Sequence, residues 1–288
     1  MSDAGQAIIN RFDHATVVVR DIEDATVRYA KLLGKPATWR GHHPELATRA
    51  SLFGLKNGLI ELVGPAEGDE RAEGLRGLVE QRGEGLHAIA FGTDNAAACA
   101  TELRSRGLKA APPEAGEAEP DGGGDARSYR VVELSPRSTR GLSVLAVERD
   151  DVSDLQATHA PLSGAVEALD HVVIRTADPE AAVALYGAGL GIRLALDRDF
   201  RGTRMLFFRV GGVTIEVVEG GAAVADADGF GGLALRVGDI EAAHARLGDE
   251  GFALNGIRDG NKPGTQVFTV KDGTCGVPTL IIRDPARD

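Results

Sequence analysis

Hydrophobic and polar positions along the chain follow first the period of a strand and then that of a helix. Residues 12–19 are rich in valine and other β-branched residues, a pattern typical of a strand. Residues 22–33 place apolar side chains three and four positions apart, and Gly34 follows as a C-cap, which predicts a helix. Three short apolar runs separated by turn residues then predict strands at residues 36–41, 47–54 and 58–64.

The same succession of elements recurs in the second half of the chain. An apolar strand that opens with Asp13-His14 is matched 157 residues later by one that opens with Asp170-His171. Further pairs match in the same order at nearly the same offset, so we interpret the two halves as a duplication. These pairs are Tyr29 with Tyr186, Leu33-Gly34 with Leu190-Gly191, and Ile60-Glu61 with Ile215-Glu216.

Each half divides again into two similar units. Apolar runs at residues 86–92 and 231–237 open a second strand pattern, and each is followed by an alanine-rich helical pattern. The chain is therefore predicted to hold four βαβββ units and to belong to the α+β class. We expect two domains, residues 10–148 and 168–284, joined by a linker at residues 149–167.

Two segments carry strong local signals. Residues 178–191 begin with Asp178 as an N-cap and Pro179 in the first turn, which predicts a helix. Residues 112–126 combine proline, glycine and acidic residues, so we expect a mobile surface loop there.

Composition and charge narrow the classes of partner. Lys and Arg number 32 against 43 Asp and Glu, a net charge of −11, which disfavours nucleic acid and anionic membranes. No apolar run is long enough to span a membrane, and the first residues lack the core of a signal peptide. Cys99 and Cys275 are far apart in sequence and indicate no disulfide framework. We expect a cytoplasmic protein that binds a small molecule, with neither nucleic acid nor membrane as partner.

The four tandem βαβββ units, with Asp-His opening and Ile-Glu closing strands, resemble the vicinal oxygen chelate superfamily. This superfamily includes glyoxalase I, methylmalonyl-CoA epimerase, bleomycin-binding proteins and extradiol dioxygenases. The resemblance covers nearly the whole chain, in both predicted domains. It implies that two units pair into one half-open barrel whose concave face holds a metal, with ligands from the first and last strands of each unit. Because four units already complete two barrels, a monomer is expected, although exposed sheet edges could pair two chains into a homodimer.

The resemblance implies a metal site in the N-terminal domain. His14 and His87 occupy the two first-strand positions and Glu61 one last-strand position, while the other, near Leu145, holds no carboxylate. Two imidazoles and one carboxylate suit a divalent ion such as Fe, Mn, Ni or Zn and leave positions open for substrate. Catalytic residues other than these ligands are not assigned.

The second half keeps fewer of these positions. His171 and Glu216 match, but the remaining two positions fall on glycine and near Leu280. Two ligands rarely hold a catalytic metal, so this half is predicted to shape the substrate site or to be a decayed copy. A site completed between the halves by His171 or Glu216 stays an alternative. The ring-cleaving assignment is disfavoured, because those relatives keep their iron in the C-terminal half.

Several other side chains are candidates for the pocket. Two histidines lie in a strand connection that could edge it, two arginines at equivalent strand positions could meet an anionic substrate, and a tyrosine and a glutamate near a last strand could assist acid–base steps. Together with the two polar residues of the second half, the candidates are His42, His43, Arg49, Tyr129, Glu133, His171, Arg204 and Glu216.

These observations predict metal-dependent chemistry on a small oxygenated molecule in the N-terminal domain. A metal that chelates vicinal oxygens stabilises an oxyanionic intermediate, which serves dioxygenase, isomerase and lyase outcomes equally. The alternative is a metal-free protein that binds or sequesters a small molecule, like the bleomycin-resistance members. The 13 aromatic residues offer few stacking surfaces and weakly disfavour that alternative.

Overall fold

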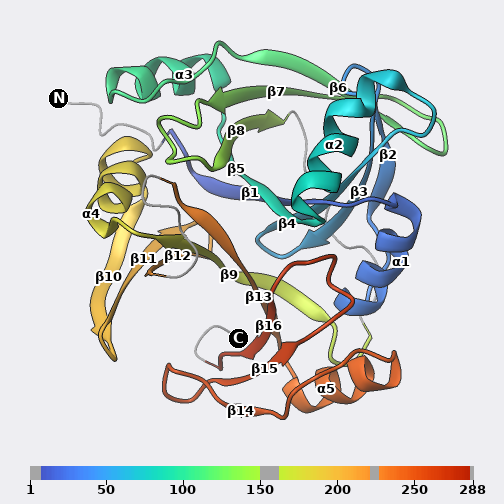
Figure 1. Ribbon diagram of the computed structural model, residues 1–288, viewed down its shortest axis with the longest axis vertical. Coiled ribbons are helices and arrows are strands. Elements are labelled where there is room, and N and C mark those ends of the chain that lie inside the picture. Colours follow the sequence, from blue (N-terminus) through green and yellow to red (C-terminus); the bar gives the residue numbers. More distant parts are fainter. Residues whose placement is uncertain (1–7, 150–161, 221–226, 286–288) are drawn as a thin grey trace.

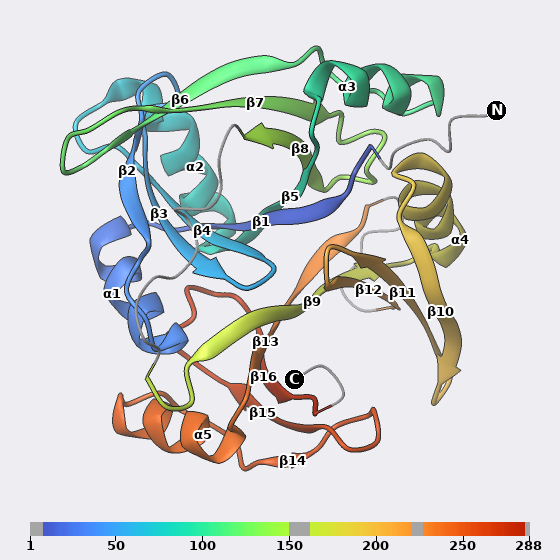
Figure 2. The ribbon, with the colours of Figure 1, turned by 180° about the vertical axis from the view of Figure 1, so that it is seen from behind.

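The computed structural model describes residues 8–149, 162–220 and 227–285. Within them, each half of the chain is built around an eight-stranded sheet, as the repeat predicted (Figure 1). Most helices pack on the outer faces of the sheets, whereas the helix at Glu73–Arg82 lies at the cavity of the first sheet; Figure 2 shows the same arrangement from behind. The α+β class and the two-domain architecture are thereby confirmed. No helix of the described residues is long and apolar enough to cross a membrane.

The N-terminal sheet closes into a barrel. Its strands follow the order β1 (Arg11–Val18), β4 (Gly58–Pro65), β3 (Thr48–Leu55), β2 (Trp39–His43), β6 (Glu114–Pro120), β7 (Arg127–Leu134), β8 (Ser143–Arg149) and β5 (Gly85–Gly92). The first strands of the two units, β1 and β5, pair antiparallel, and each is parallel to the last strand of its own unit. Each unit thus places its first and last strands side by side, where the resemblance expects ligands.

A short contact between β2 and β6 closes this barrel. Gly41 pairs with Pro120 and His42 with Glu119. A Cβ on Gly41 would stand 2.1 Å from the backbone oxygen of Glu119, so only glycine allows the two strands to approach this closely. The structure therefore has a closed barrel where a half-open one was expected.

The expected surface loop at residues 112–126 is largely a strand. Residues 114–120 form β6, which pairs with β7 on one side and with β2 on the other. Glu117 and Glu119 of β6 are exposed while Ala118 between them is buried, so these two acidic residues belong to the outer face of a strand. The prediction of a loop was wrong for residues 114–120, because β6 pairs with the following strand β7 and with β2 from a distant part of the chain.

The predicted helices form at the expected positions. In α1 (Ile22–Leu33) the Asp21 side chain accepts hydrogen bonds from the first turn, and Gly34 ends the helix with φ +69°. The two alanine-rich patterns form α3 (Ala96–Ser105) and α5 (Ile240–Asp249).

Two helical features differ from the prediction. Helix α2 (Glu73–Arg82), after a 3-10 turn at Glu70–Ala72, was not predicted, because its sequence is polar and includes two glycines. The helix predicted at residues 178–191 begins as α4 (Pro179–Ala182) and continues as a π-helix at Val183–Gly189.

The C-terminal sheet repeats the barrel order but stays open. Its strands follow the order β10 (Arg193–Phe200), β11 (Thr203–Val210), β12 (Val213–Glu219), β9 (Val166–Thr176), β13 (Gly229–Val237), β16 (Thr279–Arg283), β15 (Gln266–Val270) and β14 (Arg258–Asp259). The edge strands β10 and β14 correspond to β2 and β6 of the first half. Most of the predicted linker lies outside the described residues, so the exact domain boundaries stay a prediction.

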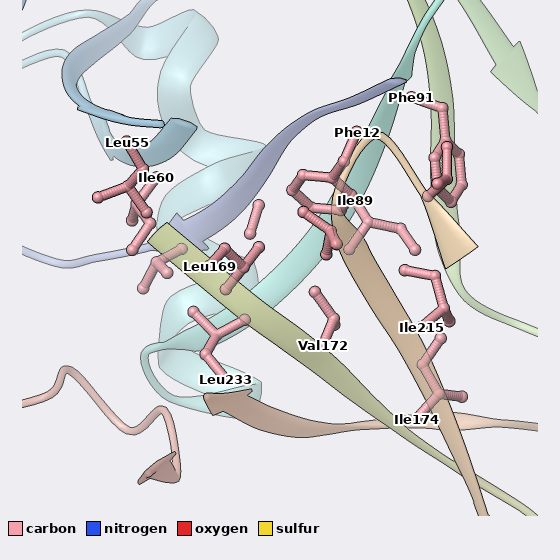
Figure 3. Packing of buried hydrophobic residues seen from close by; sticks show 14 of the residues in the cluster. Phe12, Leu55, Ile60, Ile89, Phe91, Leu169, Val172, Ile174, Ile215 and Leu233 are labelled. Atoms are coloured by element: carbon pink, nitrogen blue, oxygen red, sulfur yellow. The ribbon is translucent and has the colours of Figure 1, made fainter. Parts of the chain in front are cut away.

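The two halves share one continuous apolar core. Side chains of both contribute, among them Phe12 and Ile89 from the first half and Leu169, Val172 and Leu233 from the second (Figure 3). Burial of this apolar surface is the main force that holds the halves together.

A polar clasp fixes the register of the halves. Asn57, in the turn between β3 and β4, donates from Nδ2 to the Leu169 carbonyl at 2.8 Å and accepts from the Leu169 N–H at 2.9 Å. The Tyr29 hydroxyl donates to the Thr274 carbonyl at 3.1 Å. The exposed Lys56 also pairs with Glu167 across the same junction.

We predict that Asn57→Ala lowers the free energy of unfolding by roughly 1–3 kcal/mol, because it leaves the backbone groups of Leu169 without partners. Urea denaturation at neutral pH measures this change. Lys56→Ala is the control, and as an exposed ion pair it should cost less than about 1 kcal/mol. Equal losses in the two variants would show that the clasp contributes nothing specific.

Candidate active site in the N-terminal barrel

A cavity of about 540 Å³ lies inside the N-terminal barrel. All eight strands of the barrel line it, together with Leu75 of α2. Part of the wall is apolar, and the deeply buried part carries His14 and Glu61. The apolar lining residues include Val18, Leu46, Val63, Leu75, Val131, Leu145 and Val147.

Three charged side chains form a chain through the floor of this cavity. The Nδ1 atom of His14 lies 2.6 Å from Oδ1 of Asp13, and its Nε2 atom lies 3.3 Å from Oε2 of Glu61. A register shift between β1 and β5 at Asp13 marks a bulge, which lets neighbouring side chains of one strand meet. Thr16 donates a hydrogen bond to the same Glu61 oxygen at 3.0 Å.

Arg149, at the end of β8, completes the chain. Its Nε atom donates to Oδ1 of Asp13 at 3.1 Å, and its guanidinium lies 5.9 Å from the ring centre of Tyr129. The four groups alternate in sign from Arg149 through Asp13 and His14 to Glu61. Each buried charge therefore lies beside a charge of opposite sign, which offsets the free energy that burial of a single charge would cost.

The pKa values follow from this alternation. Burial alone would lower the pKa of His14, but the Glu61 charge and the hydrogen bond to Asp13 raise it to about 9. Burial would raise the pKa of Glu61, yet the adjacent His14 charge lowers it to about 2. Arg149 and His14 likewise hold the pKa of Asp13 well below its usual range. At neutral pH the floor therefore carries an imidazolium between two carboxylates.

His43 approaches the floor from β2. Its Nε2 atom lies 3.9 Å from Oε1 of Glu61, and its Nδ1 atom lies 3.1 Å from the Tyr129 hydroxyl. Burial lowers the pKa of His43, so this imidazole is neutral at neutral pH. Among the candidate pocket residues, His43, Tyr129 and Glu133 line the cavity.

Three other candidates point away from the cavity. His42 lies 3.3 Å from Glu119 and is about two-fifths exposed, because neighbouring residues of a strand face opposite sides. Arg49 pairs with Asp121, and Arg204 pairs with Asp197 and Glu180 on the surface of the second half. These are surface ion pairs, so the prediction that His42, Arg49 and Arg204 enter the pocket is corrected.

The second half repeats the chain of charges around a separate cavity. His171 lies 3.0 Å from Asp170 through Nδ1 and 3.5 Å from Glu216 through Nε2. These three side chains line a cavity of about 200 Å³, and His14 and Glu61 line the other one. The alternative in which His171 or Glu216 completes the N-terminal site therefore has no support in this geometry.

His14 and Glu61 fit two adjacent ligands of a divalent ion. Ligand atoms about 2.1 Å from one ion are about 3 Å apart, close to the observed 3.3 Å. His87 lines the same cavity, but it occupies a bulge where β5 pairs irregularly with β1, and burial and nearby Arg82 lower its pKa. Among the described residues, no three His, Cys, Asp or Glu side chains gather closely enough to hold an ion.

Sequence reasoning missed two residues of the floor. Asp13 was noted only as part of the repeated Asp-His pair, although this repeat was itself a signal for a functional carboxylate. Arg149 was placed in the linker, and no pattern in the sequence indicates that the end of β8 reaches Asp13.

The raised pKa of His14 predicts a pH dependence of stability in metal-free protein. Because the pKa rises on folding, its stabilisation is complete below about pH 6.5 and is lost as pH rises through about 9. Between pH 7 and pH 10 the free energy of unfolding should therefore fall by on the order of 3 kcal/mol more than in His14→Gln. Urea denaturation in the presence of a chelator measures both proteins. Parallel pH profiles would contradict the assignment.

Comparisons with known proteins agree with the fold. The model of a glyoxalase-like domain matches residues 12–187, and that of the glyoxalase/bleomycin resistance protein/dioxygenase superfamily matches residues 168–286. No curated protein matches the chain.

Solved structures share the fold at low sequence identity. A variant of 4-hydroxymandelate synthase from Streptomyces coelicolor is 17% identical over 96% of this chain and 92% of its own, with a TM-score of 0.66. A hypothetical protein from Staphylococcus aureus is 9% identical, over 96% of this chain and all of its own, with a TM-score of 0.66. A xylose isomerase-like/4-hydroxyphenylpyruvate dioxygenase fusion protein is 14% identical over 98% of this chain and 50% of its own, with a TM-score of 0.62. With the two family models, these findings show that the chain belongs to the glyoxalase-like family and is a tandem protein of the vicinal oxygen chelate superfamily.

Proposed function

We propose that the N-terminal barrel is the active site of an enzyme that acts on a small oxygenated molecule. In this proposal His14 and Glu61 bind a divalent cation, with His87 of the same cavity wall as the third ligand. The observation that carries the proposal is the buried contact of 3.3 Å between His14 and Glu61 inside a cavity of about 540 Å³. Enzymatic activity also agrees with the names of two structural neighbours, a synthase and a dioxygenase fusion.

The remaining residues of the floor orient this ligand pair. Asp13 accepts from Nδ1 of His14 and thereby turns Nε2 toward Glu61, the carboxylate–histidine arrangement typical of metal ligands. Arg149 keeps Asp13 ionised, and Thr16 fixes one oxygen of Glu61. A divalent cation bound there supplies Lewis-acid polarisation of the substrate oxygens.

His43 is the best placed group to move a proton. It is neutral at neutral pH, lines the cavity and contacts the Tyr129 hydroxyl, so it can accept a proton from the substrate and return it. The apolar lining around this polar floor suits a substrate with an oxygenated end and a small apolar part. Dioxygenase, isomerase and lyase reactions are all compatible with this arrangement. The cytoplasmic location and the choice between monomer and homodimer stay predictions from the sequence.

The second candidate is a metal-free binding protein, as the sequence also allowed. One observation favours it: among the described residues, the side chains of His87, His14 and Glu61 do not lie close enough together to bind one metal ion. The same cavity would then hold its ligand by the apolar wall and by hydrogen bonds to the charged floor.

Metal binding separates the two candidates. We predict that purified protein takes up about one equivalent of a divalent transition metal. His14→Ala and Glu61→Ala should each abolish uptake, because each removes one of the two adjacent ligands. His87→Ala should weaken uptake, and His42→Ala is the matched control on the outer face. Elemental analysis after reconstitution and desalting measures the metal content. Wild-type protein without metal, or uptake that is unchanged in His14→Ala, would favour the binding protein.

Ion binding should also release a proton. At pH 7 His14 carries a proton on the nitrogen that faces Glu61, and an ion at this position must displace it. Titration calorimetry with Zn²⁺ in buffers of different ionisation enthalpy should give a release of about one proton per ion. A heat independent of the buffer would exclude His14 as the ligand.

A further inference from the structure

The cavity of the C-terminal half carries an excess of positive charge. It measures about 200 Å³ and lies on the concave face of the open sheet. Arg198, Arg209, Arg258 and Lys262 line it, facing the carboxylates of Asp170, Glu216 and Asp284. Because the chain has a net charge of −11, this local excess of positive charge is unexpected and suggests a site for an anion.

The carboxylates already have partners other than the arginines. Asp170 and Glu216 flank His171 at 3.0 and 3.5 Å, and Asp284 lies 2.5 Å from Nζ of Lys262. No ion pair joins a carboxylate of the described residues to any of the three arginines. Their polar contacts there are with neutral groups: Arg209 donates to the Thr214 hydroxyl and Arg258 to a backbone carbonyl.

Arg198 is held in place without a hydrogen-bond partner for its buried Nε atom. Its guanidinium lies over two aromatic rings, 5.2 Å from the centre of Phe200 and 5.9 Å from that of Phe207. Such stacking fixes the plane of a guanidinium and leaves its edge available for an anion. A buried N–H without a partner is costly, so an acceptor in the cavity would stabilise this arrangement.

The arginines come from both edges of the sheet that fails to close. Arg198 lies on β10 and Arg258 on β14, the two strands that correspond to the paired β2 and β6 of the first half (Figure 1). Strand β10 has no glycine like Gly41, which allows the close approach in the first barrel. Positive charges facing each other across the opening also oppose closure, and an anion between them would remove that repulsion.

The wall of the cavity selects among anions. Met205 and Phe207 of β11, Val267 of β15, and Leu280 and Ile282 of β16 line it beside the arginines. An inorganic anion would gain nothing from this apolar surface, whereas an organic anion would bury its own apolar part there. Arginine forks suit the two oxygens of a carboxylate.

We propose that the C-terminal cavity is a second ligand site that binds a small organic carboxylate with an apolar body. Arg198, Arg209 and Arg258 bind the carboxylate, and the apolar wall receives the remainder of the molecule. The site is separate from the N-terminal cavity and needs no metal. The ligand bridges the two edges of the open sheet.

Sodium benzoate is the probe for this proposal, titrated calorimetrically into the full-length protein at low ionic strength. We expect binding that weakens about tenfold in Arg198→Gln and in Arg209→Gln, and less in the exposed Arg258→Gln. Arg137→Gln, which removes an exposed charge from the first half, should bind as wild type does. His14→Ala should also bind normally, which distinguishes this site from the N-terminal cavity and from the metal proposal.

Hydrogen exchange of backbone amides tests the same proposal in wild-type protein, without any substitution. Benzoate should slow exchange of the backbone amides of β10 and of the β14–β15 hairpin in wild-type protein, because it bridges these edges. Inorganic phosphate should bind more weakly than benzoate. The proposal is overturned if benzoate does not bind, if phosphate binds as well as benzoate, or if Arg209→Gln binds benzoate as wild type does. Loss of binding in His14→Ala alone would place the benzoate in the first cavity.

Discussion

The buried charge chain of the first barrel is the constraint on which the rest of the N-terminal half depends. Asp13, His14 and Glu61 are each less than a tenth exposed, and removal of any one charge would leave its neighbours uncompensated. The barrel holds them together because β1 lies between β4 and β5, so that Glu61 of β4 faces the same interior as His14. A cation between Nε2 of His14 and Glu61 is favoured electrostatically, and at neutral pH a proton takes that role in the metal-free protein.

The two halves have the same strand order, but their cavities differ in size and in the charged side chains that line them. The first barrel closes where Gly41 allows β2 to approach β6, and it encloses a balanced set of charges. The second half keeps the Asp-His and Glu pattern but stays open, with arginines from both edges around a smaller cavity. The shared apolar core and the Asn57 clasp hold the two cavities in one body.

The sequence allowed the fold to be predicted because the repeat, the strand runs and the helix caps are local signals. The family resemblance singled out His14, Glu61 and His87, and all three line one cavity. Two errors arose because the partners of a segment cannot be read from its own sequence: β6, which pairs with β2 and β7, was taken for a loop, and Arg149, which binds Asp13, for part of the linker. A third error concerned which face of a strand a residue occupies. Arg204 was a candidate for the pocket but faces solvent, while Arg209 on the opposite face of β11 lines the second cavity. Without knowledge of the register, one residue of error moves a side chain to the wrong face.

Direct observation of the His14 ring nitrogens tests the central claim most sharply. In metal-free protein labelled with ¹⁵N-histidine, both ring nitrogens of His14 should carry protons at pH 7.5, and the imidazolium should lose its proton only near pH 9. A His14→Gln spectrum assigns the resonance. A His14 ring that titrates at or below the ordinary value of 6.5 would contradict the account, because the imidazole would then not be held between two ionised carboxylates.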